Sequence, residues 1–250
     1  MTVLDKAIVA VSGGIDSTVC LYEAIKNCGV NNTIAVSCSY GQKHSIELHK
    51  ADALCERLGI AHITVDLINI FSYNLNVSSL MSGSNRCVNE GRYRCDGSVM
   101  DTYIPNRNGL IINILCTIGL QVFNNEPFNV VIGTHNGDAP AYPDCSNEFI
   151  NTTAEAISMA TAGKCKLYAP LQGMDKTQVV KKGVELGMTK ADFNKTYSCY
   201  AGGINQCGKC ATCIDRITAL VDSGVYTRVS DITANYELSD IGAMEYFNGR

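Results

Sequence analysis

The sequence lacks three features that would point to particular classes of protein. Lys and Arg number 20 against 24 Asp and Glu, so there is no excess of basic residues of the kind that nucleic-acid binders carry. The longest apolar stretch, residues 109–120, is interrupted by Asn113 and is too short to cross a bilayer. The first residues do not have the layout of a signal peptide. We therefore predict a soluble, cytoplasmic protein that binds neither membranes nor nucleic acids directly.

Cysteine, by contrast, is abundant, with 13 residues in a chain of 250. An odd number of cysteines in a chain of this length without a leader argues against a disulfide scaffold. We expect reduced thiols: four closely spaced cysteines as metal ligands and most of the others as small buried hydrophobic residues. The hydrophobic fraction of 46% is ample for one large domain or for one domain with a small appendage.

The strongest local signal is the glycine-containing stretch Val11–Val19. It follows the apolar run Ala7–Val11, which is typical of a buried parallel strand, and it leads into a helical pattern that ends at Gly29. Paired glycines let the backbone approach an anion, and the N–H groups at the start of a helix point at it. The stretch therefore predicts a phosphate site, although it matches neither the Walker A loop nor the dinucleotide fingerprint.

The spacing Ser-Gly-Gly-x-Asp-Ser resembles the PP-loop of the ATP pyrophosphatase superfamily. Those enzymes bind the β and γ phosphates of ATP while an acceptor oxygen attacks the α phosphate. A Gly-Gly turn in any other α/β fold is the alternative, but Asp16 and Ser17, placed between a strand and a helix, favour the PP-loop. The predicted ATP-binding residues are Val11, Ser12, Gly13, Gly14, Ile15, Asp16, Ser17, Thr18, Val19, Cys20 and Leu21.

Strand and helix patterns alternate through the first 190 residues. Further strands are predicted at Thr33–Ser37, Ile60–Leu67, Asn129–Gly133 and Lys166–Pro170, and helices at Ser45–Leu58, Gly109–Phe123, Asn147–Ala160 and Val179–Leu186. Repeated strand–helix units predict an α/β fold with a doubly wound, mostly parallel sheet, Rossmann-like and of the adenine nucleotide alpha hydrolase type. We assign 1–190 to this domain and 191–250 to a zinc-binding region with a C-terminal helical segment. Residues 72–101 predict a long loop or lid, or a subunit contact.

Polar residues gather at the expected ligand edge of this sheet. Asn108 could cap the apolar helix that it precedes, or the neighbouring Arg107 could hold an anion, and the sequence favours neither. The carboxylates of Asp138, Asp144 and Glu148 suit Mg²⁺ or the N–H edge of a purine-like ring. For Asp144 alone, capping of the helix at 147–160 is slightly favoured. His135 is expected to be structural.

Four cysteines form a compact pattern near the C-terminus. Cys199, Cys207, Cys210 and Cys213 lie within fifteen residues, and the glycines between them permit tight turns. Four thiolates at about 2.3 Å form a closed, tetrahedral structural zinc site. The Cys-x2-Cys-x2-Cys part also resembles a ferredoxin-type iron–sulfur run, but that run continues to a fourth cysteine where this chain has Ile217. Zinc is therefore favoured.

Together these elements resemble the 7-cyano-7-deazaguanine synthase (QueC) family over nearly the whole chain. The matching elements are the PP-loop, Tyr40–His44, Ile104–Asn108, Tyr142–Cys145 with Glu148 and Phe149, and Ser198–Tyr200 with the cysteine pattern. The resemblance implies an ATP-dependent carbon–nitrogen ligase of queuosine biosynthesis, working as a homodimer. Such an enzyme converts 7-carboxy-7-deazaguanine and ammonia into 7-cyano-7-deazaguanine through an adenylated carboxylate and then an amide.

The resemblance also implies roles for particular residues. The implied catalytic residues are Asp16, Ser17, Lys43, His44 and Arg107; the implied substrate-binding residues are Asn108, Asp138, Tyr142 and Asp144; and the implied zinc ligands are Cys199, Cys207, Cys210 and Cys213. ATP is expected to bind with Mg²⁺ bridging its phosphates, and the zinc is expected to be structural.

The chain departs from the family pattern around the expected substrate pocket. Ala139, Pro140 and Ala141 stand where family members usually have Tyr-Ser-Gly, and Ser146 stands where they have Arg. A related deazapurine substrate, or a reaction that stops at the amide, is therefore an alternative. A second alternative is a PP-loop tRNA-modifying enzyme of the thiolase type, which the acidic net charge of −4 does not favour.

Overall fold

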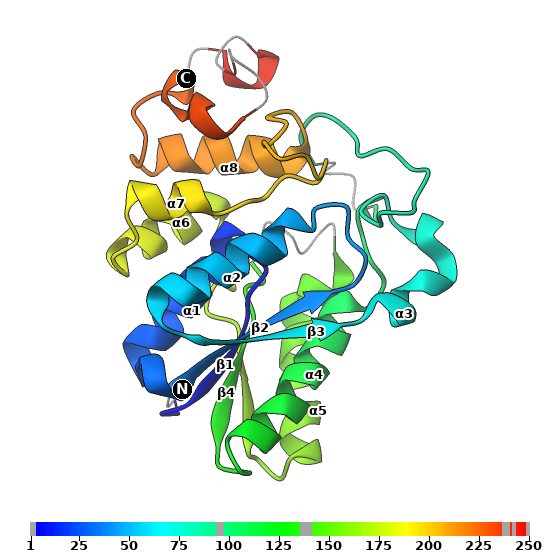
Figure 1. Cartoon of the computed structure of the whole chain (residues 1–250), viewed down its shortest axis with the longest axis vertical. Helices are drawn as coiled ribbons and strands as arrows, with labels where there is room; N and C mark the ends of the chain where they lie inside the picture. Colours follow the sequence, from blue (N-terminus) through cyan, green and yellow to red (C-terminus); the bar gives the residue numbers. More distant parts are fainter. Residues whose placement is uncertain (1–3, 94–97, 136–141, 237–240, 242–243, 249–250) are drawn as a thin grey trace.

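Five parallel strands form a single sheet in the computed structural model, which describes residues 4–93, 98–135, 142–236, 241 and 244–248 (Figure 1). The strand order is β3-β2-β1-β4-β5, so the chain builds outward in one direction and then returns to add β4 and β5 on the other side. The strands are β1 (Ala7–Ala10), β2 (Thr33–Ser39), β3 (Ala61–Asp66), β4 (Phe128–Val131) and β5 (Cys165–Tyr168). The predicted α/β fold with a parallel sheet is confirmed.

The central strand β1 connects the two halves of the sheet. Ala7 pairs with Thr33 of β2 on one side and with Asn129 of β4 on the other. The strand order reverses between β1 and β4, and in such sheets the loops after the two strands separate and leave a crevice for ligands. The segment after β1 is the PP-loop, so the topology puts the predicted phosphate site at this crevice.

Helices cover both faces of the sheet, because alternate residues of each strand point to opposite sides. From β1, Ala7 and Val9 pack in one apolar cluster with helices α1 and α6, whereas Ile8 packs in another with α4 and α5. The helices are α1 (Ile15–Cys28), α2 (Ile46–Leu58), α3 (Ile68–Phe71), α4 (Arg107–Val122), α5 (Asn147–Ala160), α6 (Lys176–Glu185), α7 (Lys190–Lys195) and α8 (Ala211–Asp222). Short 3-10 segments are η1 (Val30–Asn32), η2 (Ser72–Val77), η3 (Pro143–Cys145), η4 (Val229–Asn235) and η6 (Glu245–Phe247).

The slightly favoured cap of the helix at 147–160, Asp144, is wrong, and of the two alternatives left open at residues 107–108 the Asn108 cap is not the one observed. Helix α4 begins at Arg107, one residue before the predicted cap Asn108, because Asn106 turns the chain with a left-handed φ of 54°. Helix α5 is capped by Ser146, whose side chain accepts from the Phe149 N–H, and not by Asp144. Asp144 lies in η3 and instead accepts a hydrogen bond from the Asn108 N–H at 2.9 Å. Both residues therefore join α4 to the segment before α5.

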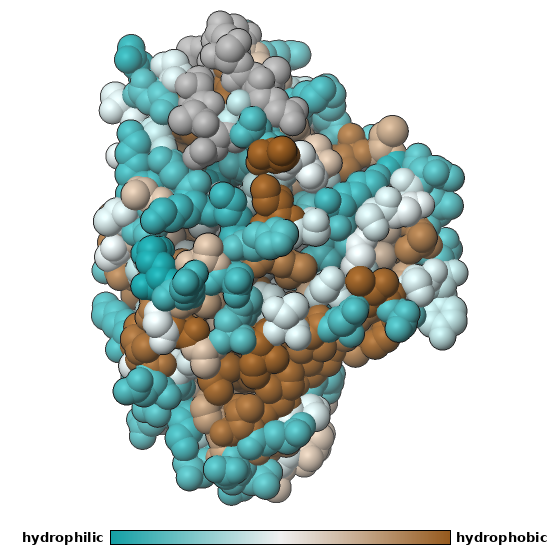
Figure 2. Space-filling model, in the orientation of Figure 1, coloured by the Kyte–Doolittle hydropathy of each residue, from teal (hydrophilic) through white to brown (hydrophobic). Residues whose placement is uncertain are grey.

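The predicted apolar helix at 109–123 is buried on one side only. Ile112, Leu115 and Gly119 are buried, whereas Ile114 and Ile118 are partly buried and Val122 is 40% exposed. Figure 2 shows apolar side chains gathered on the face of the molecule that carries β3 and α4. No helix among the described residues is long and apolar enough to cross a membrane.

The cysteine region packs directly on the PP-loop domain. Figure 1 shows α6, α7 and α8 together at one end of the molecule, and one apolar cluster runs from α1 to the four cysteines. The Tyr197 N–H donates to the Gly13 carbonyl at 2.9 Å, and the loop at 72–101 reaches the same region where the Gly91 N–H donates to Lys209 O. Long-range contacts thus fix the PP-loop from outside its own strand and helix.

Candidate active site

The PP-loop connects β1 to α1 in a conformation that requires glycine. Gly13 has a φ of +86°, and a Cβ there would lie only 2.3 Å from the Glu47 carbonyl oxygen. Ser17 accepts from the Ser12 N–H at 3.1 Å, and the Thr18 hydroxyl donates to the Gly14 carbonyl at 2.7 Å. None of the described side chains caps α1, whose N-cap is Gly14. The first N–H groups of α1 are therefore available to an anion.

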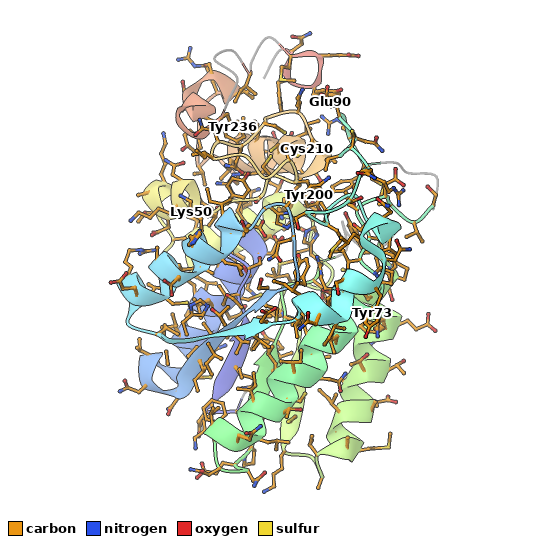
Figure 3. The ribbon with its side chains drawn as sticks, turned by 45° about the vertical axis from the view of Figure 1, so that its right-hand side comes forward. Lys50, Tyr73, Glu90, Tyr200, Cys210 and Tyr236 are labelled. Atoms are coloured by element: carbon orange, nitrogen blue, oxygen red, sulfur yellow. The ribbon has the colours of Figure 1, made fainter. Side chains whose placement is uncertain are left out.

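A cleft opens above the PP-loop and is lined by several separate parts of the chain. The lining residues with polar side chains include Ser12, Asp16 and Ser17 of the PP-loop, His44 and Glu47 at the start of α2, Arg107 and Asn108 of α4, Lys176 of α6, and Ser198 and Tyr200 of the cysteine region. Figure 3 shows Tyr200 between Cys210 and the sheet. A ligand in this cleft would contact the carboxyl-terminal side of the sheet and the cysteine region together.

Asp16 is held by two basic side chains. Lys176 Nζ donates to both Asp16 oxygens, at 2.7 and 2.6 Å, and His135 Nε2 lies 3.8 Å from Asp16 Oδ2. Burial raises the pKa of Asp16, but Lys176 and His135 outweigh it, so the pKa lies below its ordinary value. Asp16 is therefore ionised at neutral pH, and Lys176 brings a positive charge to the turn.

Lys176 was missed by the sequence reasoning, although its location was predictable. The capping box of Asp175 and Gln178 puts Lys176 at the first position of α6. Only the tertiary packing of α6 against α1 brings that position to the PP-loop. His135 was expected to be structural. Its contact with Asp16, like that of Lys176, was not indicated by any local sequence pattern.

Arg107 forms the opposite wall of the cleft. Its Nη1 donates to the Tyr40 hydroxyl at 3.4 Å, and its Nε and Nη2 donate to Asn108 Oδ1 at 3.3 and 3.2 Å. Burial opposes the charge, but Tyr40 and Asp144 raise the pKa of Arg107 above its ordinary value. The guanidinium is therefore a partly buried cation, held by hydrogen bonds to Tyr40 and Asn108, that lines the same cleft as the PP-loop.

Asn108, Asp144 and Tyr142 lie together next to Arg107. Asn108 donates to the Asp144 carbonyl oxygen at 3.2 Å, and the Tyr142 hydroxyl lies 2.6 Å from the Thr102 hydroxyl and 3.2 Å from the Tyr200 hydroxyl. A smaller cavity lined by Arg107, Tyr142, Asp144 and Tyr200 adjoins the cleft. The predicted substrate residues of the described chain therefore converge on one place.

The four predicted metal ligands are also brought together. The sulfurs of Cys199, Cys207, Cys210 and Cys213 all lie within 4.8 Å of one another, and all four residues are buried. The Cys207 N–H points at Cys199 Sγ at 3.2 Å, and the Cys210 N–H points at Cys207 Sγ at 3.4 Å. N–H donors stabilise thiolates, and this donor set is the one that structural zinc prefers. The cluster therefore fits a zinc ion.

A comparison with protein families matches residues 6–224 to the model described as "Queuosine biosynthesis protein QueC". The chain belongs to the QueC family. As a member, it is an enzyme of queuosine biosynthesis. The matched region includes the PP-loop, Arg107 and the four cysteines.

Curated relatives in the QueC family are similar over most of their length. The chain is 38% identical over 220 residues to the 7-cyano-7-deazaguanine synthase of Caldicellulosiruptor saccharolyticus, covering 88% of this chain and 92% of that protein. It is 37% identical to the synthase of Caldicellulosiruptor bescii, covering 88% and 94%. It is 34% identical over 224 residues to the synthase of Porphyromonas gingivalis, covering 88% and 94%.

Some residues predicted for the QueC site do not line the cleft. Thr18, Val19, Cys20 and Leu21 are fully buried within α1 and pack in or beside the core. Lys43 donates from Nζ to the Arg86 carbonyl at 2.9 Å, toward the loop at 72–101. Asp138, Ala139, Pro140 and Ala141 lie outside the described residues.

Proposed function

We propose that this chain is a 7-cyano-7-deazaguanine synthase whose cleft uses ATP to activate 7-carboxy-7-deazaguanine for attack by ammonia. The observation that carries the proposal is the arrangement of charge in the cleft. A helix start without a side-chain cap and the partly buried cation of Arg107 line the same cleft, so an anion can bind at each of them. ATP and a carboxylate substrate supply those two anions, and the names of the curated relatives agree with this reaction.

The proposed chemistry follows from the poor leaving ability of a carboxylate oxygen. The carboxylate first attacks the α phosphate of ATP and releases pyrophosphate, which gives an acyl adenylate. Ammonia then displaces AMP to give the amide. The amide oxygen attacks the α phosphate of a second ATP and releases pyrophosphate, and loss of AMP and of both amide protons leaves the nitrile. The protein contributes positioning and charge neutralisation rather than a covalent intermediate.

Each group of cleft residues has a role in this scheme. Ser12, Gly13, Gly14 and Ser17 bind the ATP phosphates, and Arg107 binds the substrate carboxylate. Asn108, Tyr142 and Asp144 bind the deazaguanine ring. Mg²⁺ neutralises phosphate charge when ATP is bound; since both Asp16 oxygens accept from Lys176, phosphate oxygens and water would supply most of its ligands. Zinc on the four cysteines is structural, because four thiolates leave no open position. The homodimer and the cytoplasmic location stay predictions.

The experiment that tests the proposal identifies the product and counts the nucleotides. Purified protein is incubated with 7-carboxy-7-deazaguanine, ammonium chloride and Mg–ATP, and the mixture is analysed by mass spectrometry. The expected result is the nitrile, with two AMP formed per molecule of nitrile. The Asp16→Ala variant should form neither nitrile nor AMP, while its zinc content stays unchanged. Failure of the carboxylate to stimulate AMP formation would refute the synthase activity.

The same experiment decides between the nitrile and the amide alternative. The amide alternative predicts one AMP per product and an accumulated amide. Of the altered residues, Ser146 is explained by its structural role as the cap of α5, since its hydroxyl accepts from the Phe149 N–H at 3.1 Å. That role leaves the choice between amide and nitrile to the product analysis.

A further inference from the structure

Glu47 is a carboxylate that the proposed scheme leaves without a role. It lies in the first turn of α2 and lines the cleft, and its side chain is only 12% exposed. Its backbone carbonyl packs against Gly13 of the phosphate turn. Its Oε2 lies 3.4 Å from His44 Nε2, and no other ion pair of this carboxylate is found among the described residues. A carboxylate this little exposed normally has hydrogen-bond partners, and a ligand in the cleft can supply one.

His44, the neighbour of Glu47, has an unsatisfied buried atom. Its side chain is 3% exposed, and Nδ1 is buried with no hydrogen-bond partner in the described structure. Burial and the charge of Arg107 lower the pKa of His44 to about 3, so the ring is neutral. A neutral ring with its proton on Nε2 donates toward Glu47 and leaves Nδ1 as an acceptor. His44 therefore holds the carboxylate without neutralising it.

The charges around Glu47 select the kind of ligand that fits. Burial raises the pKa of Glu47 well above its ordinary value, which means that an ionised Glu47 needs a cation beside it. Arg107 and Lys176 oppose this rise, while Asp16 adds to it. ATP and the carboxylate substrate are anions, so an ionised Glu47 would not bind them directly. Of the three reactants in the proposed function, ammonium alone is a cation and presents only N–H donors.

We propose that Glu47 binds ammonium and accepts its proton, with His44 as the positioning residue, so that ammonia is released beside the acyl adenylate. The inference rests on the proposed function. One ammonium proton passes to the Glu47 carboxylate, and the nitrogen lone pair forms the C–N bond. The C–O bond to the phosphate breaks, AMP leaves with that electron pair, and the nitrogen loses a second proton to solvent to give the amide.

Glu47→Gln tests the site, because it keeps the shape and removes the proton acceptor. With ammonium chloride as the varied substrate, the KM for ammonium should rise by about tenfold or more, as expected for loss of a hydrogen bond to a charged group. The KM for ATP should stay close to that of the unchanged protein. Glu56→Gln, an exposed residue on the same helix, is the matched control and should change neither value.

Two further measurements separate the ammonium site from other roles of Glu47. Carboxylate-dependent exchange of pyrophosphate into ATP, measured without ammonium, should persist in Glu47→Gln. Hydroxylamine, which is uncharged at neutral pH, should still trap the adenylate as a hydroxamate. An unchanged ammonium KM, or an exchange reaction lost together with amide formation, would contradict the proposal and assign Glu47 to ATP, Mg²⁺ or folding.

His44 has its own pair of variants. His44→Gln retains an N–H donor toward Glu47 and should keep the ammonium KM near its original value, whereas His44→Ala should raise it. Equal effects of the two variants on this KM would refute the positioning role. If the unchanged protein itself shows no carboxylate-dependent exchange, the proposed function fails, and the ammonium site fails with it.

Discussion

At the scale of single residues, the ion pair between Asp16 and Lys176 is the most important contact of the PP-loop that the sequence did not indicate. Asp16 is the acidic residue of the motif, and both its oxygens accept from a lysine that comes 160 positions later. The pair lies among the phosphate-binding groups and keeps the net charge of the turn from becoming negative. A lysine in this position can exchange its carboxylate partner for a phosphate when ATP binds.

Lys176→Met is predicted to lower the rate of carboxylate-dependent AMP formation by about 100-fold, as for the loss of one charge that stabilises a transition state. It should also destabilise the fold by about 1–3 kcal/mol, since Asp16 is left without its cation. Initial rates and thermal unfolding measure the two effects.

Lys181→Met is the control, because Lys181 is exposed on the same helix α6. An activity in Lys176→Met equal to that of this control would exclude the proposed role of Lys176.

At the scale of elements, helix ends decide which residues reach the cleft. Ser146 caps α5, and this leaves Asp144 to bind the start of α4, where Arg107 and Asn108 begin the cleft wall. The favoured cap Asp144 was wrong because Ser146, two residues later, supplies the cap hydroxyl, and Asn108 does not cap α4 because the helix already begins after Asn106.

Ser146→Ala should destabilise the protein by about 1 kcal/mol, the usual cost of losing an N-cap hydroxyl. Chemical denaturation measures the change. Thr152→Ala, at an exposed position of the same helix, should be close to neutral. A Ser146→Ala variant as stable as Thr152→Ala would show that the cap contributes nothing.

The cysteine cluster is the element whose metal can be tested independently of activity. Cys210→Ser should reduce bound zinc to well below one per chain and lower the stability by several kcal/mol, because metal binding contributes to folding. Cys87→Ser, at an exposed cysteine, should alter neither.

Zinc content is read by atomic emission, and stability by thermal unfolding. Equal zinc in the two variants would contradict the structural zinc site. A brown protein that contains iron would contradict the choice of metal.

The sequence predicted elements well and contacts poorly. The strands, the PP-loop and the cysteine pattern are local, since hydrophobic runs and spacings identify them without knowledge of the fold. Lys176, Glu47 and His135 were missed as site residues because tertiary packing alone brings them to the cleft. Arg107 and Asn108 were found because they stand at the entrance of an apolar helix, at the expected ligand edge of the sheet, and the family resemblance added their implied roles.

At the scale of the whole molecule, the strand order explains why one cleft can hold two anionic reactants. The reversal between β1 and β4 leaves a crevice at the PP-loop. The cysteine region lies against this crevice and is joined to the PP-loop by the hydrogen bond from the Tyr197 N–H to the Gly13 carbonyl. The predicted division at residue 190 stays a prediction, although one apolar cluster includes residues from both sides of it.

The central claim is that the substrate carboxylate attacks the α phosphate of ATP in this cleft, and an oxygen-transfer measurement tests it most directly. 7-Carboxy-7-deazaguanine labelled with ¹⁸O in its carboxylate is converted with ammonium and Mg–ATP, and the nucleotides are examined by mass spectrometry. The account predicts that the label moves into the phosphate of AMP and that pyrophosphate stays unlabelled. AMP without label, or label in inorganic phosphate, would contradict it.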